Sequence, residues 1–99
     1  MPTLHIDHAI SDLTVWRAAF EPLREVRRHA GVVRELVRQP LDDPHRIVVD
    51  LDFDTIEEAA AFLGFLETEI WATPANSPAL VGSPDAVILD TVMSADLRT

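Results

Sequence analysis

Histidines and aspartates in two short alternating stretches are the side chains best suited to chemistry. The first stretch, TLHIDHA, contains His5 and His8. A histidine can act as a general base because its ordinary pKa lies near working pH. The two histidines fall on opposite faces of an alternating strand, so they are a poor pair of metal ligands. His8 shares its face with Leu4 and Ile6 and is expected to point toward the core, as a base or as a hydrogen-bonded structural histidine.

Three aspartates alternate in the second stretch, RIVVDLDFDT. Asp50, Asp52 and Asp54 match the first three ligand positions of a calcium-binding loop. Counting from Asp50, however, Thr55 stands where the loop needs glycine, and Ala61 stands where it needs a bidentate glutamate. The pattern therefore predicts an alternating strand followed by a capped helix. A carboxylate pair that binds a cation or lines a dimer cavity is the alternative.

Composition narrows the class of protein. The 99 residues are expected to form one domain, residues 1–99, and contain no cysteine, which excludes disulfides and thiolate chemistry. The net charge of −9 opposes nucleic-acid binding. No apolar run is long enough to cross a membrane, and no signal peptide is evident at the beginning. We expect a cytoplasmic protein.

The charges are unevenly distributed along the chain. Residues 17–38 carry six arginines and three glutamates, a local charge of +3. Residues 42–99 carry twelve acidic residues and two arginines, a local charge of −10. Such asymmetry could help to orient two copies in a dimer.

The hydrophobic periodicity predicts a helix after the first strand, residues 3–9. Ser11 or Asp12 can cap a helix that begins at Leu13, and Gly31 is a natural stop. Pro22 lies inside this helical run and is expected to kink or split it.

The rest of the chain predicts a hairpin, a second helix and a last strand. Residues 32–39 and 46–53 are β-rich and flank a Pro-Leu-Asp-Asp-Pro turn. Residues 55–71 are helical in spacing, with Asp54 or Thr55 as the cap. A loop over residues 72–84 precedes a strand over residues 85–93.

This β-α-β-β-α-β order predicts an α+β, ferredoxin-like fold. With right-handed crossovers, four strands form an antiparallel sheet with both helices on one face. The other face then needs a cover, and a second copy of the chain is the simplest one.

Several segments resemble those of the dimeric α/β-barrel superfamily, in particular its short actinobacterial cyclase-like or antibiotic-biosynthesis-monooxygenase-like members. The resemblance is carried by Trp16 and Phe20, by RRHAG (27–31), by DDPHRIVVDLDFDTIEEAAAFL (42–63) and by PALVGSPDAVIL (78–89). It implies a homodimer joined through the open sheet face and a pocket in each protomer. It also implies cofactor-free oxygenation, isomerisation or cyclisation of an aromatic or polyketide-like molecule. Haem-degrading members have a histidine on the second helix, whereas residues 55–71 contain none, so haem is not expected.

Helical phase places two charged residues among apolar ones. At about 100° per residue, Arg27 falls in the same arc as Trp16 and Phe20. On the second helix Glu67 falls beside Trp71 at the edge of an apolar arc, whose predicted members are Ile56, Ala59, Leu63, Leu66 and Ile70. Arg27 and Glu67 could instead reach the surface or pair with each other.

The main hypothesis is a small enzyme with no bound cofactor or metal. Trp16, Phe20, Leu63 and Trp71 would line a pocket of a few hundred Å³. His8 or Glu67 would take a proton, and Arg27 would stabilise the resulting oxyanion.

Two alternatives stay open. One is a non-catalytic ligand-binding or interaction module, which Phe65 favours because it is expected opposite the buried arc. The other is a metal-dependent enzyme that uses His5, Asp50 and Asp52 inside the dimer.

Overall fold

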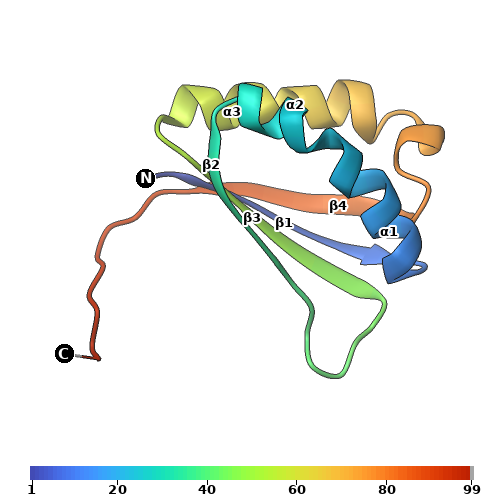
Figure 1. Ribbon diagram of the computed structural model, residues 1–99, viewed down its shortest axis with the longest axis horizontal. Helices are drawn as coiled ribbons and strands as arrows, with labels where there is room; N and C mark the ends of the chain where they lie inside the picture. The colour runs from blue at the N-terminus through green and yellow to red at the C-terminus, as the bar shows by residue number, and fades with distance from the viewer. Residues whose placement is uncertain (99) are drawn as a thin grey trace.

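The chain folds as the predicted sheet with helices on one side. The computed structural model describes residues 1–98, and its four antiparallel strands lie in the order β2-β3-β1-β4. Their bounds are Thr3–Ile10 for β1, Val32–Arg38 for β2, Arg46–Phe53 for β3 and Leu80–Leu89 for β4. In Figure 1 all helices lie on one face of this sheet, and the opposite face is open. The ferredoxin-like α+β fold is therefore confirmed.

Pro22 divides the first helical segment, as predicted. Helix α1 spans Leu13–Phe20, a 3₁₀ turn spans Glu21–Leu23, and α2 spans Arg24–His29. The backbone N–H of Val15 donates to the Asp12 carboxylate at 2.9 Å, so Asp12 is the cap. Gly31 follows α2 with φ of +106°, a conformation that disfavours any residue with a Cβ.

The central strands separate apolar from polar side chains by strict alternation. In β3, Ile47, Val49, Leu51 and Phe53 are at most 2% exposed and pack beneath the helices. Asp50 and Asp52 point to the open face, because they alternate with these buried residues. An alternating strand is thus the correct interpretation of the acidic stretch.

The second helix begins as predicted but faces the sheet differently. Helix α3 spans Ile56–Phe65 and continues into a π-helical turn, Leu66–Ile70. Thr55, rather than Asp54, is the cap, since its hydroxyl accepts from the Glu58 N–H at 3.1 Å. Ile56 is half exposed, so its prediction as a buried residue was wrong.

Phe62 and Phe65 turn inward in place of Ile56. Phe62 is buried against Phe53, with ring centroids 6.0 Å apart, and Phe65 stacks on Phe62 at 5.7 Å. The prediction that Phe65 lies opposite the buried arc was therefore wrong. Apolar residues occupy almost every position from Ala59 to Leu66, so the periodicity did not define one face.

The last strand lies several residues before its predicted position. β4 runs over Leu80–Leu89 rather than residues 85–93. Leu89 already pairs with Thr3, the first residue of β1, so later residues have no neighbouring strand to bond. At the other end, Gly82 with φ of +73° allows an irregularity through which Leu80 and Val81 still pair with β1. Across residues 1–98, no helix is both long enough and apolar enough to cross a membrane.

Candidate functional site

A small cavity lies between the helices and the sheet. We call it the inner cavity; its aromatic lining residues are Trp16, Phe20, Phe62, Phe65 and Trp71. Its polar lining comes from His8, Arg27, Asn76 and Ser77. The cavity measures about 80 Å³, well below the few hundred expected, because the phenyl and indole rings fill most of the space.

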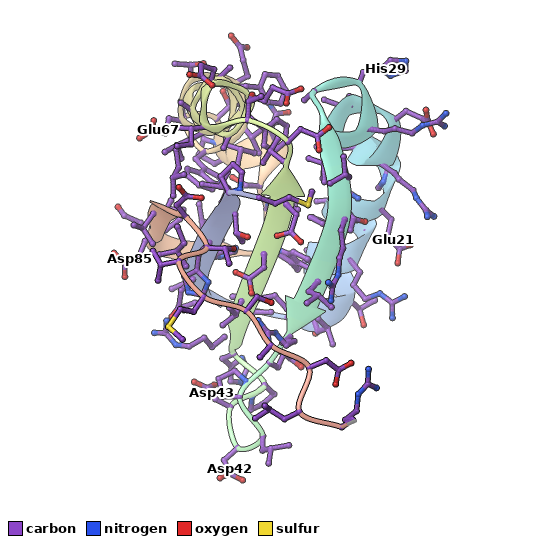
Figure 2. The ribbon with its side chains drawn as sticks, turned by 90° about the vertical axis from the view of Figure 1, so that its left-hand side faces the viewer. Glu21, His29, Asp42, Asp43, Glu67 and Asp85 are labelled. Atoms are coloured by element: carbon purple, nitrogen blue, oxygen red, sulfur yellow. The ribbon has the colours of Figure 1, made fainter. Side chains whose placement is uncertain are left out.

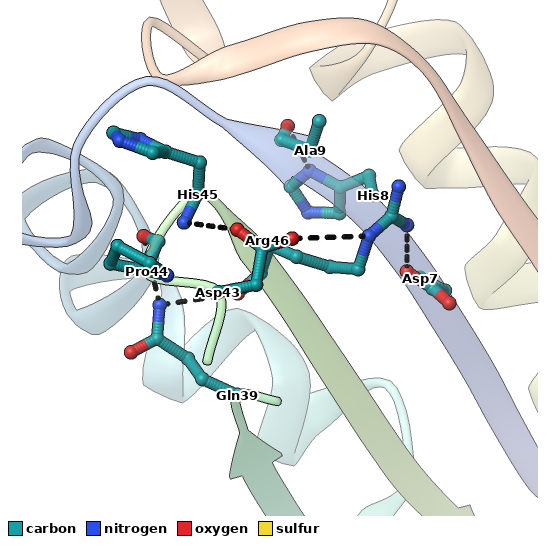
Figure 3. Close-up of polar contacts among 8 residues, drawn as sticks. All are labelled: Asp7, His8, Ala9, Gln39, Asp43, Pro44, His45 and Arg46. Carbon is teal, nitrogen blue, oxygen red and sulfur yellow. Dashed lines mark hydrogen bonds and ion pairs between the residues drawn. The ribbon is translucent and has the colours of Figure 1, made fainter. Parts of the chain in front are cut away.

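His8 reaches the inner cavity from an irregular part of β1. Asp7 pairs with Asp85 and Ala9 pairs with Val81, so residues 82–84 bulge opposite His8. The side chain is 6% exposed and lies on the helix-covered face, as predicted. Its Nδ1 lies 3.2 Å from the carbonyl oxygen of Ala9 (Figure 3).

The hydrogen bond of His8 defines which nitrogen is free. A carbonyl oxygen only accepts, so Nδ1 carries the hydrogen and donates it to Ala9. In the neutral ring the lone pair is then on Nε2. No buried side-chain nitrogen or oxygen of the described chain lacks a partner, and Nε2 forms no hydrogen bond with those residues. Nε2 therefore contacts open space, and the lining of the inner cavity includes His8.

Burial keeps this imidazole neutral. Desolvation lowers the pKa of His8 below its ordinary value of 6.5. The positive charge of Arg46 acts in the same direction, whereas the hydrogen bond to Ala9 and the charge of Asp7 partly oppose it. At neutral pH, His8 is consequently a base with an available lone pair.

Arg27 lies at another part of the lining, and its guanidinium is bound on several sides. It is 4% exposed, and its Nε and Nη2 donate to the Glu35 carboxylate at 2.6 and 3.3 Å. Its Nη1 donates to the carbonyl oxygen of Phe20 at 2.6 Å, and the guanidinium carbon lies 3.6 Å from the centre of the Phe20 ring. Arg27 thus joins α2 to the end of α1 and to β2.

Glu67 is not part of the inner cavity. It is exposed on the π-helical turn and projects outward in Figure 2. Together with Leu63 it lines a separate depression beside β4, and Trp71 lines both spaces. The structure therefore brings together His8, Arg27, Trp16, Phe20 and Trp71, but places Leu63 and Glu67 elsewhere.

Sequence reasoning missed two aromatic and two polar residues of the inner cavity, and the partner of Arg27. Phe62 and Phe65 were missed because the apolar residues of α3 do not define one face, as described above. Glu35 alternates with exposed residues in VVRELVR, and its register opposite Leu51 puts it on the helix-covered face. Asn76 and Ser77 belong to a loop around the 3₁₀ turn Pro74–Asn76, and nothing in their spacing indicated a site.

Polar side chains on the open face of the sheet pair with one another. His5 Nδ1 lies 2.6 Å from the Asp50 carboxylate, and Arg38 also pairs with Asp50. Asp7 pairs with Arg46 and not with His5. Figure 3 shows the contact between Asp7 and Arg46. His5 of β1 thus pairs with Asp50 of the neighbouring strand β3.

The metal alternative receives no support from these side chains. Among residues 1–98, no three His, Cys, Asp or Glu side chains are placed to hold a metal ion, and this includes His5, Asp50 and Asp52. The other two histidines, His29 and His45, are exposed.

Comparison by sequence identifies no relatives. No model of a known protein family matches the chain, and no curated protein matches it significantly.

Comparison by structure places the fold among known ones. A monooxygenase from the ActVA-Orf6 gene of Streptomyces coelicolor, solved with nanaomycin D, superposes with a TM-score of 0.70 at 16% identity, covering 99% of this chain and 92% of that one. SnoaB from Streptomyces nogalater, a cofactor-independent oxygenase, gives 0.68 at 14% identity, covering 99% and 97%. A dimeric ferredoxin-like protein from an uncultured marine organism gives 0.65 at 10% identity, covering 95% and 97%. The chain thus shares its ferredoxin-like fold with these proteins.

Proposed function

We propose that the protein binds a small aromatic or polyketide-like molecule in the inner cavity and acts on it without a bound cofactor. The observation that carries this proposal is His8, a buried neutral base that lines an aromatic space and whose Nε2 forms no hydrogen bond within residues 1–98. Two proteins of similar structure are a monooxygenase and a cofactor-independent oxygenase, which supports the same class of activity.

In the proposed chemistry His8 acts as the general base. Its Nε2 would accept the proton of a phenol or of an acidic C–H, and the ligand would become an anion. This anion would react with dioxygen in an oxygenase, or rearrange in an isomerase or cyclase. The aromatic lining would hold the ring and exclude water, since few polar groups reach the cavity.

Arg27 has a positioning role in this proposal. Its hydrogen bonds are directed to Glu35 and to the Phe20 carbonyl rather than into the cavity. It would therefore hold Phe20 in the cavity wall. Oxyanion stabilisation by Arg27 remains a prediction, and Glu67 is not used.

A second candidate is a binding module without turnover. The placement of two predicted catalytic groups favours it, because Arg27 is bound to Glu35 and Phe20 and Glu67 does not line the cavity. Both candidates require ligand binding, and only the first requires His8 as a base.

The experiment is a paired measurement of binding and turnover. Nanaomycin D and simple phenols would be titrated against tryptophan fluorescence, because Trp16 and Trp71 both line the cavity. Product formation and oxygen uptake would follow for every compound that binds. We expect His8→Gln to lower turnover by about 100-fold or more while changing affinity by less than about threefold.

His29→Gln is the matched control, because His29 is exposed and bonds only the carbonyl of Glu25 at 2.8 Å. Binding without turnover would favour the binding module. Absence of any binding would contradict both candidates.

We also propose a homodimer formed through the open sheet face. Two solved structures of this fold are described as dimeric ferredoxin-like proteins. On the open face of this chain Leu36, Val87 and Leu89 are 38–48% exposed, around the paired charges of Asp50 and Arg38. Light scattering should give the mass of two chains, and Val87→Arg should shift it toward one.

The cytoplasmic location also remains a prediction.

A further inference from the structure

The size of the inner cavity requires that an aromatic ligand extend beyond it. A dry apolar cavity of about 150 Å³ can hold a single benzene ring, whereas the inner cavity offers about 80 Å³. Three surface depressions share lining residues with it. A bound molecule must therefore occupy part of one of them, and their charges differ.

Two of these depressions have acidic linings and are unsuited to an anion. The depression beside β4 is lined by Glu67 and Asp85, with no basic residue. The depression between α1 and the π-helical turn has Glu69 as its one charged lining residue within the described chain. Neither could hold an acidic group against these carboxylates.

The third depression has the opposite charge. It lies between the first helical segment and β2, measures about 610 Å³, and we call it the arginine cleft. Its charged lining residues are Arg17, Arg24, Arg27, Arg38, Glu21 and Glu35. Four arginines against two glutamates give a net charge of +2, on a chain whose total charge is −9. The cleft is thus a local positive region on an acidic protein.

Arg24 is the cation of the cleft that internal contacts leave available. Arg17 pairs with Glu21 at 2.9 Å, Arg27 pairs with Glu35 at 2.6 Å, and Arg38 pairs with Asp50. Within residues 1–98, no carboxylate forms an ion pair with Arg24. A guanidinium that has no acidic partner can bind a carboxylate through two parallel hydrogen bonds.

The wall between cleft and cavity is aromatic. Trp16, Phe20 and Arg27 line both spaces, and the Trp16 and Phe20 rings stack with centroids 4.5 Å apart. Displacement of Phe20 would join the two spaces. A ring could then lie against Trp16 with its substituent in the arginine cleft.

Resting on the proposed function, we propose that the ligand is an aromatic acid whose carboxylate is bound in the arginine cleft, with Arg24 as the residue that determines this specificity. With the Phe20 ring displaced, the aromatic part lies against Trp16 in the joined space of inner cavity and cleft, and the negative charge lies with Arg24. Neutral analogues of the same shape lose this contact and bind more weakly.

The test compares 2-naphthoate with its neutral analogue 2-naphthamide by titration of tryptophan fluorescence. We expect 2-naphthoate to bind about tenfold more tightly at low salt, since a hydrogen bond to a charged group contributes on the order of 1.5 kcal/mol. Arg24→Gln should lower the affinity for 2-naphthoate by about five- to tenfold and leave that for 2-naphthamide within about twofold. Raising the salt concentration should weaken 2-naphthoate alone.

Arg28→Gln is the matched control on the same helix, because Arg28 is exposed, pairs with Glu25 at 3.5 Å and does not line the cleft. It should leave both affinities unchanged. If 2-naphthamide binds as tightly as 2-naphthoate, or if Arg24→Gln affects both equally, the specificity is wrong and the proposed function stands. If neither compound binds, both proposals are overturned.

Discussion

The two polar groups buried at the inner cavity, His8 and Arg27, are satisfied in opposite ways. His8 makes one hydrogen bond, to the carbonyl of the next residue, and leaves Nε2 open. Arg27 is bound to Glu35, to the Phe20 carbonyl and to the Phe20 ring. Both are more than nine-tenths buried, so burial alone does not separate them.

The difference indicates which group is suited to chemistry. A buried charge needs partners, and the partners of Arg27 come from two other elements, α1 and β2, which makes it a structural connection. A buried neutral imidazole needs only one partner, which leaves the other nitrogen available to a ligand. Substituting Arg27 should therefore mainly lower stability, and substituting His8 should mainly impair proton transfer.

The largest expected effect is on stability, from Arg27→Ala. The substitution removes the hydrogen bonds to Phe20 and Glu35 and the packing of the arginine stem. We expect the free energy of unfolding to fall by about 2–4 kcal/mol, measured by urea denaturation. Glu35 is 31% exposed in its side chain, so water can partly hydrate the carboxylate that remains.

Two further variants test the cause of that loss. Arg27→Met keeps much of the apolar stem and should recover about half of the lost stability. Glu35→Gln leaves the guanidinium buried beside a neutral group and should itself be destabilising. A loss below about 1 kcal/mol for Arg27→Ala would show that the arginine is not the connection described here.

An intermediate effect is expected from pH at His8. Its pKa is lower in the folded protein than the ordinary 6.5, so below that pH the unfolded chain binds more protons. Stability from this group is complete above about pH 6.5 and is lost as pH falls toward the folded pKa. For one proton the slope is at most about 1.4 kcal/mol per pH unit.

The variant His8→Gln isolates this contribution. The difference in unfolding free energy between the two proteins should change below about pH 6.5 and stay constant above it. A difference that is independent of pH across this range would mean that His8 is protonated equally in both states. The same protonation should reduce turnover in acid, because His8⁺ cannot accept a proton.

The smallest expected effects on stability come from substituting two glycines. One of them, Gly31, follows helix α2, which carries Arg27. Gly31 has φ of +106°, and an added Cβ would lie 2.3 Å from Oε2 of Glu58, whose carboxylate also contacts Thr55. We expect Gly31→Ala to lower the free energy of unfolding by about 1–2 kcal/mol. Gly64 in α3 has open space around its Cα, so Gly64→Ala should raise stability by about 0.5–1 kcal/mol. Equal changes in the free energy of unfolding for the two variants, measured by chemical denaturation, would contradict this prediction.

Much of the architecture was predictable because local signals agreed. The alternation of Ile47, Val49, Leu51 and Phe53 fixed one face of β3, and Asp12 and Gly31 marked the limits of the first helical segment. The position of β4 was less predictable. Its ends depend on pairing with β1 and on an irregularity at residues 82–84, neither of which is a local property.

The candidate site was predictable in part. His8, Trp16 and Arg27 followed from period and phase, because each lies in a segment with a clear apolar face. Glu67 did not, because the helix that carries it is apolar on nearly every side and turns π-helical before that residue. Phase computed from an α-helical repeat is not valid across such a turn.

The sequence by itself determined the order of the elements, the buried face of each central strand and the exclusion of cysteine chemistry. These properties depend on residue types and short repeats, which act within a few residues along the chain. Tertiary structure decided that Glu35 pairs with Arg27, that Phe62 and Phe65 line the inner cavity and that no carboxylate of residues 1–98 pairs with Arg24. Those outcomes depend on which residues from distant segments meet, and only the packing of the helices on the sheet fixes that.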